Sequence, residues 1–120
     1  MPNQRVLLAE DDFTMVALLK TLLGMEGYEV IAIENEDEVI QAARSHNPDV
    51  LLMDVHLFGQ NGLDILTDIR NTGDVAGLRI IMSSGANVKE ECLKRGANAF
   101  LMKPYMPNDL VELLRTVIAA

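Results

Sequence analysis

The stretch of sequence that decides the fold is Pro48–Asp54, PDVLLMD, in which four consecutive apolar residues end at an aspartate. A continuous apolar run of this length is typical of a strand buried on both faces, as in a parallel sheet covered by helices. Pro48 also stops any helix that precedes it, because proline has no amide hydrogen to donate. The stretch therefore predicts a strand over 50–53, with the carboxylate of Asp54 at its carboxyl end.

Four further apolar runs lie on either side of this one. They predict strands at Val6–Ala9, Tyr28–Ile33, Ile80–Met82 and Phe100–Met102. The segments between the runs carry apolar residues at helical spacing or helix-capping signals. They predict helices at Met15–Leu23, Glu36–His46, Leu63–Arg70 and Val88–Arg95, and a last helix capped by Asn108.

Local signals mark the ends of several of these helices. Asn35 and Glu38 have the spacing of a capping box at the start of the second helix. Gly24 and Gly27 close the region of the first helix, and Gly96 follows the fourth helix as a C-terminal cap. Five strands that alternate with five helices predict an α/β fold with a doubly wound parallel sheet covered on both faces. The 120 residues are enough for one such domain, which we expect to span 1–120.

The composition excludes several classes of protein. The formal net charge is −8, and an acidic surface repels phosphate backbones, so we expect no direct binding of nucleic acid. The sequence has no run of 18 apolar residues and no secretion signal at residues 1–5, so we expect no membrane span. The lone Cys92 cannot form an internal disulfide, which fits a reducing compartment. We therefore expect a cytoplasmic protein.

Reactive side chains are predicted to gather at the carboxyl ends of the strands, where doubly wound folds bind their ligands. They are Glu10, Asp11 and Asp12 after the first strand, Asp54 after the third, Ser83 and Ser84 after the fourth, and Lys103 after the fifth. Two like charges about 4 Å apart repel by roughly 4 kcal/mol at an effective dielectric constant of 20, so clustered carboxylates need a cation. Oxygen ligands of this kind favour Mg²⁺.

Each of these residues also has a simpler interpretation. A lone acid after a strand is usually solvated or caps a helix, but three acids from two strand ends favour the metal. Lys103 is either a surface lysine at a turn or a ligand of phosphoryl oxygens. Ser84 alone is weak evidence, because serines commonly end strands. His56 is a lone loop histidine, which is more often a solvated polar residue than a metal ligand or a catalytic base.

These residues together resemble response-regulator receiver domains of two-component signalling over essentially the whole chain. The matching segments are Val6–Asp11, Pro48–Asp54, Gly62, Ile80–Gly85 and Gly96–Pro104. Each segment alone is weak evidence for the family, but the order and spacing of all of them together are highly specific. The resemblance, which is to chemotaxis regulators in particular, implies a flavodoxin-like sheet with the strand order 2-1-3-4-5.

The resemblance also implies how the acidic site works. Asp54 corresponds to the phosphoacceptor and Asp11 to a direct Mg²⁺ ligand, while Glu10 acts on the metal through water. The backbone carbonyl of His56 corresponds to the third protein ligand. Asp12 competes for a place in the acidic pair, but alignment through the following residues favours Glu10 and Asp11.

A second group of residues is implied to act in catalysis and switching. Lys103 corresponds to the invariant lysine, and its bond to Pro104 is expected to be cis. Ser84 corresponds to the hydroxyl switch and Phe100 to the switch aromatic. Ser83 competes with Ser84, and we choose Ser84 because it directly precedes a small residue, as the family pattern requires.

The function implied is that of a signalling switch rather than an enzyme, with weak self-phosphorylation and autodephosphorylation chemistry. The phosphoryl donor is expected to be a histidine kinase or phosphotransfer protein. Phosphorylation is expected to remodel the surface made by helix four, strand five and helix five, and so to control an output partner or domain. A phosphorylation-dependent dimer is compatible with this scheme. The sequence names neither pathway nor kinase, and it leaves open whether the receiver stands alone or belongs to a longer protein.

Two features depart from the family pattern. Receivers usually carry proline four residues after the acceptor, where this chain has Phe58, in a loop that contains Gly59 and Gly62. The segment from Ser84 to Gly96 is about one helical turn shorter than usual, which puts the contacts of the output surface in doubt.

Three rival functions remain to be weighed. A haloacid-dehalogenase-type phosphatase needs an aspartate two residues after the nucleophile, and this chain has His56 there. A flavodoxin-like cofactor binder needs a Ser/Thr/Gly-rich phosphate loop after the first strand, and this chain has the acidic run Glu10–Asp12. A phosphorylation-independent interaction module of the same fold stays open, because only a phosphorylation assay excludes it.

Overall fold

The computed structural model describes residues 4–35, 38–57 and 59–119. Its main sheet, within these residues, has five parallel strands: β1 (Arg5–Ala9), β2 (Glu29–Ile33), β3 (Val50–Asp54), β6 (Ile80–Ser84) and β7 (Ala99–Met102). They lie in the order β2-β1-β3-β6-β7. Counted along the chain, this is the order 2-1-3-4-5, so the predicted doubly wound sheet is confirmed.

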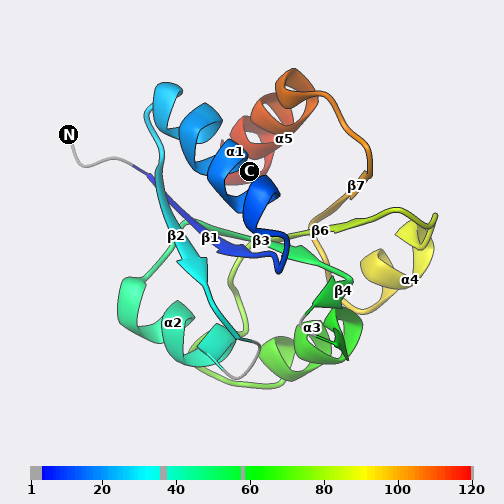
Figure 1. Cartoon of the computed structure of the whole chain (residues 1–120). Coiled ribbons are helices and arrows are strands. Elements are labelled where there is room, and N and C mark those ends of the chain that lie inside the picture. Colours follow the sequence, from blue (N-terminus) through cyan, green and yellow to red (C-terminus); the bar gives the residue numbers. More distant parts are fainter. Residues whose placement is uncertain (1–3, 36–37, 58, 120) are drawn as a thin grey trace.

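Helices cover both faces of the sheet (Figure 1). They are α1 (Phe13–Met25), α2 (Val39–His46), α3 (Gly62–Arg70), α4 (Lys89–Lys94) and α5 (Pro107–Ala119). Helices α1 and α5 lie on one face, and α2, α3 and α4 lie on the other. Among the described residues, no helix combines the length and apolar character needed to cross a membrane.

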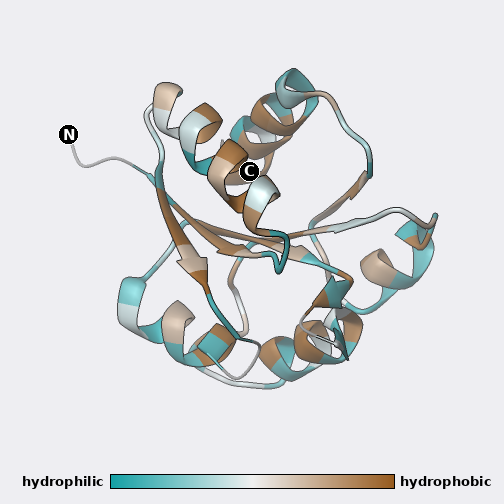
Figure 2. Ribbon diagram, in the orientation of Figure 1, coloured by the Kyte–Doolittle hydropathy of each residue, from teal (hydrophilic) through white to brown (hydrophobic). Residues whose placement is uncertain are grey.

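The strands divide the core in two because successive side chains point to opposite faces of the sheet. Leu7, Leu51 and Met82 pack in what we call the α2/α3/α4 core, whereas Leu8 and Leu52 pack in the α1/α5 core. Every residue of β3 is buried, as its continuous apolar run predicts. Each such leucine contributes about 1.5–3 kcal/mol relative to an exposed one. Figure 2 shows the apolar strands between helices that turn their polar residues outward.

Side-chain caps begin two of the helices earlier than the apolar pattern predicts. The Asp12 carboxylate accepts hydrogen bonds from the backbone N–H groups of Thr14 (2.9 Å) and Met15 (3.2 Å), so α1 begins at Phe13. Asn61 caps α3 in the same way, through its side-chain oxygen. Periodicity of apolar residues reports the buried face of a helix and does not locate the residue that caps its first turn.

Two predicted helix starts need comment. Asn108 was predicted as the cap of the last helix, and this is wrong: α5 begins at Pro107, and Asn108 lies in its first turn. Proline suits that position, because its missing N–H would have no partner in the helix. The predicted start at Glu36 lies outside the described residues. Near it, the Asn35 amide donates to the Glu38 carboxylate over 2.9 Å. Within the described residues, no side-chain hydrogen bond caps α2, which begins at Val39 after Glu38, so the predicted capping box is wrong.

The segment after β3 contains a small hairpin that the sequence did not predict. Strands β4 (His56–Leu57) and β5 (Gln60–Asn61) pair antiparallel, and His56 lies opposite Asn61. Gly59 has φ +79°, a conformation that favours glycine. The departure noted at Phe58 lies outside the described residues. Strands of two residues are too short to give a periodic pattern, which is why only a loop was expected here.

Candidate functional site

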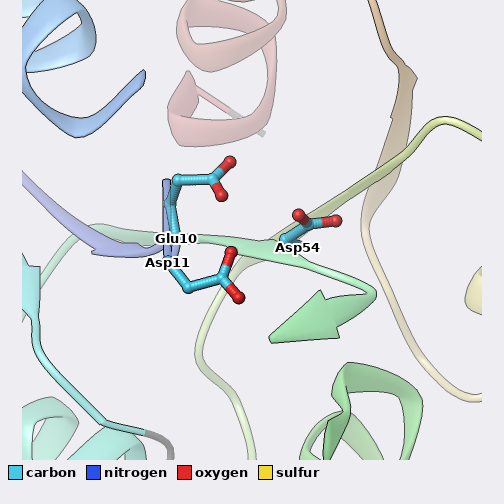
Figure 3. Close-up of side chains that lie close together, drawn as sticks. All are labelled: Glu10, Asp11 and Asp54. Carbon is cyan, nitrogen blue, oxygen red and sulfur yellow. The ribbon is translucent and has the colours of Figure 1, made fainter. Parts of the chain in front are cut away.

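Three carboxylates meet at the carboxyl ends of β1 and β3. These strands are neighbours, with Ala9 opposite Met53, so the residues that follow emerge side by side. Glu10, Asp11 and Asp54 each offer an oxygen, and these oxygens lie within 4.8 Å of one another. Figure 3 shows the three side chains close together at this edge of the sheet. The predicted acidic cluster is therefore formed by the fold.

Lys103 bonds to two of the acids in this cluster. Its ammonium Nζ donates to Glu10 Oε1 over 2.7 Å and to Asp54 Oδ2 over 2.9 Å. Its backbone N–H donates to the carbonyl oxygen of Ser84 over 2.8 Å, which holds the residue beside β6. The bond from Lys103 to Pro104 is cis, as expected. The lysine, just after β7, is therefore joined to an acid that follows β1 and to the acid that ends β3.

The electrostatics of the site favour a bound cation. Glu10 is 5% exposed and Asp54 is 9% exposed, so both carboxylates are shielded from water, whereas Asp11 is exposed. Burial alone would lower the pKa of Lys103, but its hydrogen bonds to Glu10 and Asp54 outweigh this and raise the pKa above its usual value. One ammonium cannot neutralise three carboxylates. The excess negative charge and the hard oxygen donors fit Mg²⁺.

Backbone atoms of the hairpin and of the first residue of α3 lie close to Asp54. The backbone N–H of His56 points to Asp54 Oδ1 at 3.4 Å, while the His56 side chain is exposed. A Cβ atom on Gly62 would overlap the carbonyl oxygen of Asp54 and lie 3.1 Å from the Cα of Val55. Only glycine fits at position 62, which gives a physical reason for this part of the sequence pattern.

The two serines at the end of β6 are both buried, at 3% exposure for Ser83 and 1% for Ser84. The Ser84 hydroxyl oxygen accepts a hydrogen bond from the Ala86 N–H over 3.1 Å. Phe100 is partly buried against the α2/α3/α4 core, the core in which Met82 of β6 also packs. The fold therefore brings Ser84 and Phe100 to the same side of neighbouring strands, and their proposed roles in switching are taken up below.

Tyr105 is a residue of the site region that the sequence interpretation missed. It is partly buried against the α1/α5 core. Burial raises the pKa of Tyr105 above its usual value; Lys103 opposes this rise, and Glu10 and Asp54 add to it. Its hydroxyl therefore stays protonated at neutral pH. The signal that could have found it is its place two residues after Lys103.

Comparison with known proteins decides the family. A family model described as the response regulator receiver domain matches residues 6–115. The chain belongs to this family. Receiver domains are signalling switches of two-component systems: they take phosphoryl groups from histidine kinases, act on output domains and bind Mg²⁺ in the active site. The predicted resemblance and fold are thus confirmed.

Relatives of the receiver fall into two length classes. The chemotaxis protein CheY of Thermotoga maritima is 30% identical over 117 residues, which cover 96% of this chain and 98% of that protein. The DNA-binding response regulator MtrA of Mycobacterium tuberculosis is 30% identical over 116 residues, covering 94% of this chain but 50% of that protein. The chain thus spans about half the length of MtrA and of the transcriptional regulatory protein CpxR of Klebsiella pneumoniae, which it also matches.

Solved structures agree with this assignment. The receiver domain of a sensor histidine kinase from Pseudomonas aeruginosa, with a magnesium ion coordinated in the active site cleft, has a TM-score of 0.88 and 26% identity, covering 98% of this chain and 99% of that one. A CheY-like receiver domain protein from Methanospirillum hungatei has a TM-score of 0.87 and 28% identity, covering 98% and 94%.

Proposed function

We propose that residues 1–120 form one receiver domain whose phosphoacceptor is Asp54, and that its donor is the phosphohistidine of a histidine kinase or phosphotransfer protein. The observation that carries this proposal is the setting of Asp54. Its buried carboxylate lies beside those of Glu10 and Asp11 and accepts a hydrogen bond from Lys103. Among the described residues this is the one cluster of three acids placed to hold a cation, and Asp54 is its buried aspartate.

The reaction would move a phosphoryl group from nitrogen to oxygen. A carboxylate oxygen of Asp54 attacks phosphorus, a P–O bond forms as the P–N bond breaks, and the electron pair of that bond returns to the imidazole nitrogen, which takes up a proton. In autodephosphorylation, water attacks the same phosphorus, the P–O bond to Asp54 breaks, and inorganic phosphate leaves. Phosphorylation and hydrolysis at Asp54 would set the state of a switch. We therefore propose that the protein is a signalling switch rather than an enzyme.

The protein would lower the barrier mainly by placing positive charge near the transferring group. Lys103 is within reach, because its ammonium already contacts Asp54, and it can turn from the carboxylates to a phosphoryl oxygen. When bound, Mg²⁺ would supply further positive charge to the phosphoryl oxygens. Asp11, Asp54 and the backbone carbonyl of His56 are the proposed protein ligands, and Glu10 the residue that acts through water.

The output is proposed to follow from Ser84 and Phe100. Phosphorylation of Asp54 adds charge and acceptor oxygens at the end of β3. Ser84 is proposed to move toward them and Phe100 to turn inward, which would remodel the surface made by α4, β7 and α5. That surface would then control an output partner or domain, or a phosphorylation-dependent dimer.

A phosphorylation assay with a matched control tests the acceptor. Incubated with Mg²⁺ and phosphoramidate, a small donor with a P–N bond, the parent protein should gain the mass of one phosphoryl group. Asp54→Asn should gain none. Asp68→Asn alters an exposed aspartate on α3 and should be labelled like the parent. Stoichiometric labelling of Asp54→Asn would contradict the assignment of the acceptor. If neither the parent nor the two variants were labelled, the phosphorylation-independent module would be favoured.

A further inference from the structure

The two serines at the end of β6 face opposite sides of the sheet. Side chains alternate along a strand, so the neighbours of each serine show its side. Met82 packs in the α2/α3/α4 core and Ile81 in the α1/α5 core. Ser84 therefore shares the side of Met82, which is also the side of Phe100, and Ser83 shares the side of Ile81.

Asp54 lies on the same side as Ser83. The residue two positions before Asp54, Leu52, packs in the α1/α5 core, as does the residue two positions before Ser83. Asp54 and Ser83 are also direct partners in the register of β3 with β6. Neighbouring strands of a sheet lie about 4.7–4.9 Å apart. The Ser83 hydroxyl is thus on the face, and at the level, of the acceptor carboxylate.

The side chain of Lys103 crosses β6 above Ser83. Its backbone lies beside β6 on the β7 side, where its N–H bonds to Ser84. Its ammonium contacts Asp54 at the end of β3, on the other side of β6, and reaches Glu10 beyond it. Two strand spacings, roughly 10 Å, separate β7 from β3. The lysine therefore spans the strand that carries Ser83, on the face that Asp54 and Ser83 share.

Ser83 puts a hydroxyl at a strand position that is only 3% exposed. Its backbone carbonyl accepts a hydrogen bond from the Val55 N–H over 2.9 Å. A hydroxyl in such a place is favourable only where it has a hydrogen-bond partner, and Asp54 lies at the matched position of the neighbouring strand. Serine can reach a new partner by changing one side-chain rotamer.

We propose that Ser83 is a positioning residue of the phosphoryl-transfer site, with its hydroxyl donating a hydrogen bond to the Asp54 side chain. The proposal rests on Asp54 as acceptor. In the structure Lys103 holds one oxygen of Asp54; once the ammonium turns to the phosphoryl group, that oxygen needs another donor, and Ser83 is the adjacent one. The two serines then have separate tasks, Ser83 at the acceptor and Ser84 at the switch.

Three substitutions of Ser83 test this proposal by the rate of labelling with phosphoramidate and Mg²⁺. Ser83→Ala removes the hydroxyl and should slow labelling by about three- to tenfold, the effect of one hydrogen bond of ordinary strength. Ser83→Thr and Ser83→Val have the same shape, and only threonine keeps the hydroxyl. Threonine should therefore label at least several-fold faster than valine. Ser45→Ala, on the exposed side of α2, is the control and should label like the parent.

The outcomes separate this proposal from the proposed function. Two results would overturn the role of the hydroxyl while leaving Asp54 as acceptor. The first is an equal labelling rate for the parent, Ser83→Ala and Ser83→Val. The second is an equal loss of labelling rate in Ser83→Val and Ser83→Thr. Failure of the parent protein to label would instead contradict the proposed function. Thermal unfolding of each variant serves as a second readout, because a role in packing alone would separate Ser83→Val from Ser83→Thr in stability without separating their labelling rates.

Discussion

At the scale of single residues, the site depends on the different exposure of its acids. Glu10 is buried and bonded to Lys103, whereas Asp11 is exposed to solvent. A cation that approaches from solvent therefore meets Asp11 first. Glu10 is already bonded to the ammonium, which fits an indirect role toward the metal.

This difference predicts an order of metal affinities. Asp11→Ala removes a direct charged ligand and should weaken Mg²⁺ binding the most. Glu10→Gln keeps an oxygen beside Lys103 and should weaken binding less, by about tenfold, as expected for a group that acts through water. Titration calorimetry on the parent and both variants measures the order. Equal affinities for the parent and Asp11→Ala would argue against the proposed site.

A second prediction concerns the close approach of α3 to Asp54. Gly62→Ala places a methyl group against the Asp54 carbonyl and the Val55 backbone, and such overpacking should cost about 1–3 kcal/mol of unfolding free energy. Gly73→Ala is the matched control, since its Cβ would meet nothing within 4 Å. Urea denaturation compares the two variants. Equal stability of both would show that the backbone at Gly62 can relax.

At the scale of elements, Arg70 at the end of α3 ties together the segments that lead into β6 and β7. Its guanidinium donates to the carbonyl oxygens of Ala76 (3.0 Å), Leu78 (2.6 Å) and Gly96 (2.9 Å), and to the side chain of Asn98 (3.0 Å). Burial lowers the pKa of Arg70 below its usual value, but the group remains charged at neutral pH. This contact network sets where the two switch-bearing strands begin.

Loss of these contacts should destabilise the fold. Arg70→Met leaves several partly buried carbonyls without a donor, and each costs about 1–3 kcal/mol, so we expect a loss of at least 2 kcal/mol. Arg44→Met breaks an exposed pair with Asp74, and solvent screening means that its effect on stability should be much smaller. Thermal or urea unfolding measures both. A similar small effect for both variants would mean that water replaces Arg70 at these carbonyls.

The sequence predicts some elements better than others, and the reasons are physical. The strands β1, β3 and β6 were predicted because burial on both faces leaves a continuous apolar run. Boundaries that depend on single polar contacts, such as the Asp12 cap, were missed by one or two residues. The hairpin was missed because it is short. That Ser83 rather than Ser84 lies opposite Asp54 was not predicted either, since it follows from the register of β6 against β3.

At the scale of the whole molecule, three exposed hydrophobic residues lie on or beside the elements from which the output is proposed. Leu93 of α4, Met102 of β7 and Met106 before α5 are all large exposed hydrophobic residues. Helix α4 has six residues, in keeping with the short segment noted in the sequence. A helix this short presents little surface to a partner. We therefore expect the largest structural changes on phosphorylation in β7 and at the start of α5.

The proposed switch predicts a specific structural difference. In a complex with Mg²⁺ and beryllofluoride, which mimics the phosphorylated aspartate, the Ser84 hydroxyl should leave the Ala86 N–H and bond to the mimic. Phe100 should then rotate inward, and the surface around Met102 should change. Crystal structures with and without the mimic make the comparison. If Phe100 kept one rotamer in both, signalling would have to follow another route.

The central claim, that Asp54 alone accepts the phosphoryl group, is tested most directly by locating that group in the unaltered protein. After brief reaction with phosphoramidate and Mg²⁺, the acyl phosphate is trapped by borohydride reduction and the peptides are sequenced by tandem mass spectrometry. The account predicts a single modified residue, Asp54, and no modification when Mg²⁺ is removed by a chelator. Modification at any other residue, or equal labelling without Mg²⁺, would contradict it.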